Sequence, residues 1–185
     1  MKKVIFLSGV SGVGKSTAGK ALGNKPVSVV ELDSLVRAFY SRLKVGSDTT
    51  NPYRFDDWEK FLSIHKNNVV LLNAFQEFIL HAPPEENVNL LLIGNHFLLP
   101  SFEQTLSNTL TPLGFEPAIK LLLDLNWKKI YFYRKKRGTF RDKQSSMKDV
   151  ISQISHYRSV LHPRGYISVK TKQFHTILRN YFQIS

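Results

Sequence analysis

Apolar residues occur along this chain in short, continuous runs separated by longer amphipathic stretches. Runs of this kind that stop at a glycine or a polar residue are typical of strands buried on both faces of a parallel sheet. The pattern predicts strands at residues 3–8, 27–32, 89–94, 128–134 and 166–171. Because these runs alternate with amphipathic segments, we expect an α/β fold with helices on both faces of the sheet.

The stretches between the runs carry apolar residues at helical spacing. They predict helices at residues 16–22, 33–44, 101–110, 147–161 and 173–182, a long helical region at 56–82 and a short helix at 116–125. Asp33 or Ser34 would cap the second of these helices, and Ser101 would cap the helix that follows Pro100. We see no linker, so residues 1–185 are predicted to form a single domain.

The first apolar run leads into a glycine-rich stretch, GVSGVGKST, at residues 9–17. It matches the pattern G-x-x-x-x-G-K-[ST] in the context that this motif requires, with a buried strand before it and a helix after it. Backbone N–H groups of such a loop wrap a phosphate, and the positive end of the helix faces the same anion. The predicted phosphate-binding residues are Gly9, Ser11, Gly12, Val13, Gly14, Lys15, Ser16 and Thr17.

Side chains of this loop have separate predicted roles. Lys15 would reach the outer phosphates, and the Ser16 hydroxyl would ligate Mg²⁺, with Thr17 beside it. The chain has no cysteine, and none of its six histidines are paired at ligand spacing, which argues against a transition-metal site.

The positive charge is concentrated in the last third of the chain. Residues 1–119 contain 11 Lys and Arg and 11 Asp and Glu, whereas residues 120–185 contain 15 Lys and Arg against three acidic residues. The whole formal charge of +12 therefore lies in the second part. Such asymmetry predicts a polyanionic partner, either nucleotide phosphates or a nucleic acid, while a solvated basic surface is the alternative interpretation.

Composition and apolar run lengths indicate an ordinary globular protein. Hydrophobic residues make up 42% of the chain, and no apolar run approaches the roughly 20 residues of a membrane helix. The apolar stretch near the start is too short for a signal peptide and is interrupted by glycines and Lys15. We therefore expect a cytoplasmic protein that does not bind a membrane.

On these residues the chain resembles the P-loop kinases of the nucleoside-monophosphate-kinase-like fold, which include shikimate and gluconate kinases, chloramphenicol phosphotransferase and polynucleotide 5′-hydroxyl kinases. The resemblance rests on the glycine-rich loop, on Asp33, on the basic segment RKKRGTFRDK at residues 134–143 and on the layout of five strands. It implies a three-layer α/β/α fold with strand order 2-3-1-4-5. It also implies a lid at residues 134–143 and acceptor-side helices at residues 34–82.

The resemblance assigns roles to two groups of residues. Asp33 would orient or deprotonate the acceptor hydroxyl, and Arg37, one helical turn further, would bind the acceptor. A plain helix cap and a solvated arginine are the alternative interpretations. Lid arginines would neutralise the oxygens of the transferring phosphoryl group, and the candidates are Arg134, Arg137 and Arg141. Arg137 is preferred because the run KRGT resembles the lid of phage-type polynucleotide kinases.

Two further positions follow from the resemblance. Thr171 lies where related kinases contact the adenine. The third predicted strand ends in Gly94, Asn95 and His96, so the Walker B carboxylate of many P-loop enzymes is missing there. We therefore expect Ser16, the phosphates and water to hold Mg²⁺, and Asn95 and His96 to line the acceptor pocket.

The sequence thus predicts an ATP- and Mg²⁺-dependent phosphotransferase that acts on a hydroxyl or phosphate acceptor. A small molecule or nucleoside is the preferred acceptor because residues 1–119 are neutral overall. A 5′-hydroxyl end of RNA or DNA is the alternative acceptor, which the basic last third of the chain favours. Two other hypotheses are a nucleotide hydrolase without an acceptor and an enzyme that has kept the loop but lost turnover.

Overall fold

The computed structural model describes residues 2–20, 27–34 and 89–183. Within these residues, five strands form one parallel sheet. The strands are β1 (Val4–Ser8), β2 (Val27–Glu31), β3 (Asn89–Ile93), β4 (Ile119–Leu123) and β5 (Ile167–Val169). Their order in the sheet is β2-β3-β1-β4-β5, which confirms the predicted order.

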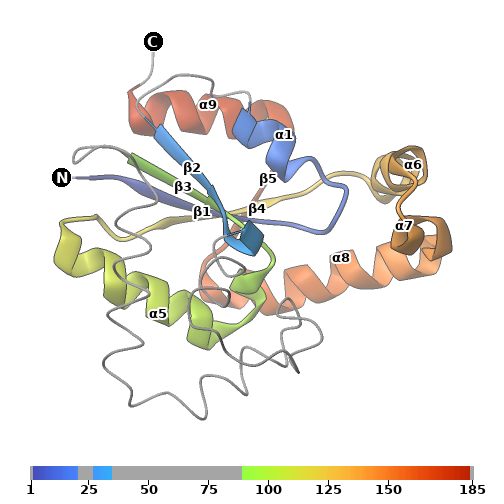
Figure 1. Ribbon diagram of the computed structural model, residues 1–185, viewed down its shortest axis with the longest axis horizontal. Helices are drawn as coiled ribbons and strands as arrows, with labels where there is room; N and C mark the ends of the chain where they lie inside the picture. Colours follow the sequence, from blue (N-terminus) through green and yellow to red (C-terminus); the bar gives the residue numbers. More distant parts are fainter. Residues whose placement is uncertain (1, 21–26, 35–88, 184–185) are drawn as a thin grey trace.

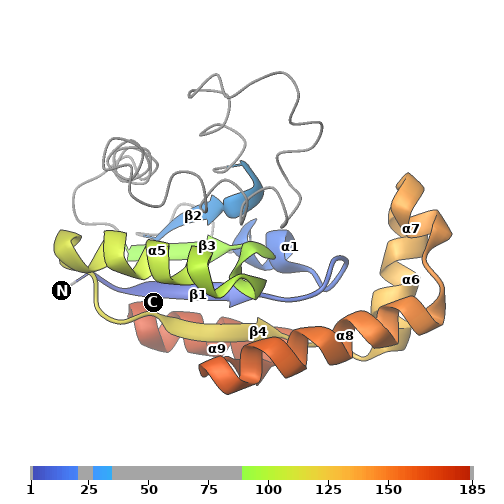
Figure 2. The same ribbon diagram turned by 90° about the horizontal axis from the view of Figure 1, so that it is seen from below.

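Helices cover both faces of this sheet, so the predicted three-layer fold is confirmed. The helices are α1 (Lys15–Lys20), α5 (Pro100–Leu110), α6 (Trp127–Arg137), α7 (Phe140–Gln144), α8 (Met147–Leu161) and α9 (Thr171–Phe182). Short 3-10 turns are η1 (His96–Leu98), η2 (Thr111–Leu113) and η3 (His162–Arg164). Helices α1 and α9 lie on one face and α5 and α8 on the other, while α6 and α7 project beyond the sheet (Figures 1 and 2). No helix in the described ranges has the length and apolarity needed to cross a membrane.

The core lies around the central strand β1, where every residue is buried. Strand β1 pairs with β3 from Val4 opposite Leu90 onward, and with β4 on its other side. The Phe6 ring stacks on Phe97 of η1, with centroids 4.8 Å apart. Because helices cover both faces of these strands, an alternating pattern is absent and the sequence is continuously apolar.

The predicted short helix at residues 116–125 and the predicted strand at residues 128–134 are both wrong. The strand is β4, and the segment 128–134 belongs to helix α6. A short apolar run that is buried on both faces cannot be told from a buried helix by periodicity. In α6 the buried residues are Ile130 and Arg134, one helical turn apart, and the Asn126 side chain caps the helix by accepting from the Lys128 N–H. The predicted lid therefore begins inside a helix rather than after a strand.

The predicted helix caps are also wrong in detail. Helix α5 has Leu99 as its N-cap and Pro100 in its first turn, so Ser101 already lies within the helix. Proline is favoured there because its ring fixes φ at a helical value. Helical geometry begins at Leu32, directly after β2, so Asp33 lies within the helical segment. The predicted helical region at 56–82, and most of the helix at 33–44, lie outside the described residues.

A buried ionic network supports the turn that follows β3. Glu103 of α5 is 6% exposed and pairs with Lys120, at 2.6 Å, and with Arg164. Arg164 also donates to the carbonyl of Phe97, at 2.8 Å, and the Tyr166 hydroxyl donates to Glu103 at 3.0 Å. Both signs of charge in this network are paired and hydrogen-bonded. Through the bond from Arg164 to Phe97, the network holds η1 next to the end of β3.

Candidate functional site

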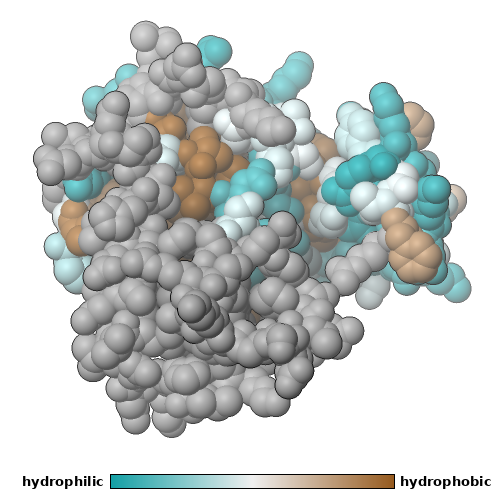
Figure 3. All heavy atoms as spheres, in the orientation of Figure 1, coloured by the Kyte–Doolittle hydropathy of each residue, from teal (hydrophilic) through white to brown (hydrophobic). Residues whose placement is uncertain are grey.

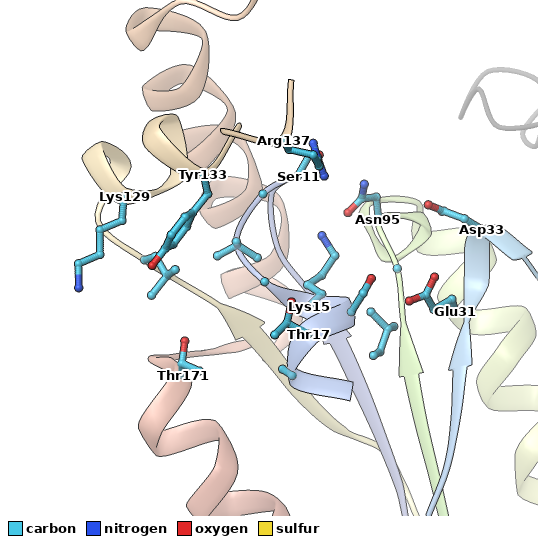
Figure 4. A pocket seen from close by; sticks show the side chains of 18 of the residues that line it. Ser11, Lys15, Thr17, Glu31, Asp33, Asn95, Lys129, Tyr133, Arg137 and Thr171 are labelled. Carbon is cyan, nitrogen blue, oxygen red and sulfur yellow. The ribbon is translucent and has the colours of Figure 1, made fainter. Parts of the chain in front are cut away.

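A pocket of about 930 Å³ opens at the carboxyl ends of the strands. Its lining includes most of the residues that the sequence predicts, namely Ser11, Gly12, Val13, Gly14, Lys15, Ser16, Thr17, Asp33, Asn95, Arg137 and Thr171. Gly9, His96 and Arg134 lie next to it but outside the lining. Arg37 lies outside the described residues, and so does the side chain of Arg141. The fold thus brings the loop, one lid arginine and the end of β2 around a single cavity (Figure 4).

The glycine-rich loop presents its backbone to this pocket. Its Val13 N–H donates to the Val10 carbonyl at 3.3 Å, and α1 begins directly after the loop at Lys15, so the first N–H groups of that helix have no partner within the helix. Gly12 and Gly14 have φ values of 84° and 96°, in the region that favours glycine. A Cβ at Gly14 would meet nothing within 4 Å, so its backbone faces open space. The loop is therefore a cradle of donors with room for an anion.

Lys15 is the cation of this cradle. Its ammonium donates to the carbonyls of Gly9 and of Val10, the latter at 3.2 Å, so it is folded over the loop. Burial lowers the pKa of Lys15 to about 8, while Asp33 acts in the opposite direction and Arg137 adds to the lowering. An anion bound in the cradle would favour the charged ammonium and raise this pKa again.

Some oxygen-bearing side chains at the pocket could bind a divalent cation. The exposed Ser16 side chain belongs to the first turn of α1, and Glu31 at the end of β2 also lines the pocket. The Asn95 Oδ1 atom is buried and has no hydrogen-bond partner in the described part of the chain. In those same residues, no three His, Cys, Asp or Glu side chains cluster as a metal site. A hard cation such as Mg²⁺ fits this set, because it uses few protein ligands together with water and phosphate oxygens.

Asp33 faces the pocket from the segment after β2 and contacts His96. Its side chain is 60% exposed, and its Oδ1 lies 3.3 Å from the Nδ1 of His96. The His96 ring is 4% exposed and packs against Phe102, with centroids 5.0 Å apart. Burial lowers the pKa of His96, and the Asp33 carboxylate opposes that shift. His96 thus contacts Asp33 from outside the pocket lining, whereas the sequence predicted that it lines the pocket.

Arg134 and Arg137 come from the last turn of α6, but their environments differ. Arg134 is 2% exposed, donating from Nε to the Ser11 carbonyl at 2.8 Å and from Nη2 to Gln153 at 2.7 Å. Arg137 is exposed, lines the pocket, and pairs with Asp142. Arg134 is thus occupied by the loop and α8, while Arg137 borders the cavity that a phosphate would enter.

Eight lining residues were not predicted as site residues from the sequence: Ala18, Glu31, Ile93, Gly94, Leu125, Lys129, Tyr133 and His175. Glu31 carries the signal that identified Asp33, a carboxylate at the end of a buried run. Lys129 and Tyr133 are one turn apart on α6, so the mistaken strand at 128–134 concealed them. With Thr171 they form the side of the pocket opposite Glu31, Asp33 and Asn95 (Figure 4).

The sheet order and the loop between β1 and α1 define the fold. It is a three-layer α/β/α P-loop fold. Neither a protein-family model nor a curated protein sequence matches this chain. The comparison with solved structures, by contrast, finds matches over the whole chain.

Three solved structures illustrate this similarity. A tunicamycin resistance protein from Deinococcus radiodurans is 13% identical, with a TM-score of 0.59 and coverage of 100% of this chain and 98% of the other. A sugar kinase from a Janibacter species is 14% identical, with a TM-score of 0.55 and coverage of 100% and 96%. A shikimate kinase from Bacteroides thetaiotaomicron is 14% identical, with a TM-score of 0.52 and coverage of 98% and 99%. At these identities the similarity establishes the fold.

Proposed function

We propose that this protein is an ATP- and Mg²⁺-dependent phosphotransferase that moves the γ-phosphoryl group to a hydroxyl of a small molecule. The observation that carries the proposal is the shared pocket. Its lining contains a P-loop lysine, the carboxylates Glu31 and Asp33 at the end of β2, and a lid arginine. A donor, an acceptor hydroxyl and a group that neutralises phosphoryl charge would meet in one cavity, as phosphoryl transfer requires.

The residues divide this chemistry between them. The loop amides and Lys15 would bind the outer phosphates, and Arg137 would balance charge on the phosphoryl oxygens. Asp33 would accept the proton of the acceptor hydroxyl. The oxygen of that hydroxyl would bond to the γ-phosphorus, while the bond between the γ-phosphorus and the bridging oxygen breaks and releases ADP. When bound, Mg²⁺ neutralises phosphate charge. Ser16 would hold it, with Glu31 supplying the carboxylate that is missing at the end of β3.

Lys129, Tyr133, Thr171 and His175 line the end of the pocket away from the carboxylates. We assign this end to the nucleoside of the donor, because the phosphates belong over the loop and the acceptor belongs beside Asp33. The acceptor end carries Glu31 and Asp33, which suit hydroxyl groups better than a phosphate-rich chain. Two of the structural neighbours are named for hydroxyl-bearing small molecules, shikimate and a sugar, which supports the same acceptor class.

Transfer from γ-labelled ATP to a panel of sugars, shikimate-like polyols, nucleosides and antibiotics tests the proposal. We expect labelled product with at least one acceptor class, and loss of transfer in both Lys15→Ala and Asp33→Ala. Asp33→Ala should leave ATP binding nearly intact, since Asp33 acts on the acceptor. Label that appears only as inorganic phosphate, whatever the acceptor, would show a nucleotide hydrolase instead.

A 5′-hydroxyl end of RNA or DNA is a second candidate acceptor, favoured by the surface of α6 and α7. This part of the molecule is mostly hydrophilic with exposed apolar side chains, which include Phe132 at 62% and Phe140 at 77% exposure (Figure 3). Exposed aromatic rings among cations suit single-stranded nucleic acid. Binding of a labelled oligonucleotide at low salt, with affinity that falls steeply as salt rises, would support this acceptor. Absence of binding at low salt would eliminate it.

A further inference from the structure

Arg137 at the mouth of the pocket is held by a carboxylate from the next helix. Its Nε donates to Asp142 Oδ2 at 2.6 Å, and its Nη2 donates to Asp142 Oδ1 at 2.7 Å. This is the bidentate geometry in which a guanidinium and a carboxylate match edge to edge. The pair spans the turn at Gly138, where α6 ends with φ at 68°. It therefore fixes the direction in which Arg137 leaves α6.

Asp142 is itself firmly placed. The residue is 3% exposed, and its Oδ2 accepts from the Thr139 hydroxyl at 2.6 Å. The Asp142 N–H donates to the same hydroxyl oxygen at 3.3 Å. These bonds, with Arg137 as the largest cause, lower the pKa of Asp142 to about 2, so the carboxylate is charged at neutral pH. A buried, charged and multiply bonded carboxylate is a rigid support for the arginine.

The pair leaves part of the guanidinium available. Nη2 also donates to the Ser11 Oγ of the P-loop at 2.9 Å, which places Arg137 against the loop. Asp142 and Ser11 thus use Nε and Nη2, whereas Nη1 has no partner among the described residues. Of the five N–H donors of an arginine, the two on Nη1 remain for a ligand in the pocket that Arg137 lines.

We propose that Asp142 is a positioning residue that holds Arg137 beside Ser11, with Nη1 free for the phosphoryl group in transfer. The inference rests on the proposed function and adds a residue to it. A long, exposed arginine would otherwise have to be ordered during the reaction, which costs side-chain entropy. An arginine that is fixed beforehand stabilises developing charge without reorganisation. Asp142 would act through Arg137 without contacting any substrate.

A double-mutant cycle on Asp142→Asn and Arg137→Ala separates this role from a merely structural one. We expect Asp142→Asn to lower kcat about tenfold to hundredfold, with the KM for ATP changed less than about threefold, because a misplaced group weakens transition-state contacts. In the Arg137→Ala background, Asp142→Asn should have no further effect on kcat. Equal losses of kcat in both backgrounds, or none in either, would overturn the inference.

Three further measurements keep this test decisive. Asp149→Asn removes a charge from the same basic region, at the start of α8 and without contact to Arg137, and should leave kcat within about twofold. If Asp142→Asn fails to fold, Thr139→Val, which removes only one support of the carboxylate, should lower kcat in the same direction. The Arg137 Nε–H resonance should be protected from exchange in the wild type and exposed in Asp142→Asn, with or without nucleotide.

These readouts also distinguish the failure of the inference from that of the proposed function. A wild-type protein that transfers no phosphoryl group to any acceptor overturns the proposed function. A wild-type protein that does transfer, together with an Asp142→Asn variant of unchanged kcat, overturns the inference alone. An Arg137 Nε–H that exchanges equally fast in the wild type and the variant also overturns it.

Discussion

The P-loop and the basic segment at residues 134–143, predicted as a lid, border the same pocket, but they are built in different ways. The loop offers backbone amides, and only Lys15 adds a side-chain charge. The lid offers side chains, and hydrogen bonds to other residues place each of its two described arginines. Arg134 is bound to the loop and to α8, while Arg137 is bound to Asp142 and touches Ser11.

This difference determines what each region tolerates. A backbone cradle depends on glycine at positions where φ is positive, because other residues are strained there. A side-chain clamp depends on hydrogen-bond partners, and losing one leaves buried polar groups unsatisfied. The two regions meet at Ser11, whose carbonyl and hydroxyl accept from Arg134 and Arg137 respectively.

Arg134→Met should show the largest effect on stability. The substitution leaves the Ser11 carbonyl and the Gln153 side chain without their donor, so we expect the free energy of unfolding to fall by about 2–3 kcal/mol. Urea denaturation measures this loss, with Arg179→Met, an exposed arginine of α9, as the matched control within about 0.5 kcal/mol. A loss no larger than that of the control would contradict the view that Arg134 joins the lid to the loop.

Alanine at Gly12 and at Gly14 tests the loop itself. Both residues have positive φ, so each substitution should cost about 1–2 kcal/mol of unfolding free energy through backbone strain alone. Gly12→Ala should cost more, because its Cβ would lie 2.9 Å from Cγ of the buried Arg134, whereas Gly14 has no neighbour within 4 Å. Chemical denaturation of both variants measures the gap. Equal losses would mean that the lid does not press on the loop.

The Asp142 carboxylate should make the lid sensitive to acid, with the smallest of these effects. Arg137 lowers the pKa of Asp142 to about 2 in the folded protein, against an ordinary value of 3.8. As the pH falls, the unfolded chain therefore takes up this proton first, so the stabilisation is present above about pH 4 and is lost on the way to pH 2. The unfolding free energies of wild type and Asp142→Asn should differ by less than about 2 kcal/mol at pH 6 and converge at pH 2. A difference that stays constant across this range would exclude the linkage.

The sequence alone predicts the features whose signal is local. The glycine pattern, the strand before it and the order of most elements could be predicted, and Asp33, Asn95, Arg137 and Thr171 do lie at one pocket. It failed for β4 and α6, because an apolar run buried on both faces of a sheet has no periodicity that marks it as a strand. That error concealed Lys129 and Tyr133, because a strand at 128–134 would place them within the sheet and not on a helix beside the pocket.

By itself, the sequence determined that a glycine-rich loop with a lysine follows a buried strand, because this motif consists of residues that are adjacent in the chain. Only the tertiary structure decided which cations surround the loop, and how. Arg134 and Arg137 are three residues apart in the same basic run. One is buried against the loop and α8, and the other is held at the mouth of the pocket by Asp142. The burial of Arg134 depends on Gln153 and on the Ser11 carbonyl, 19 and 123 residues away in the sequence, which meet it only after folding.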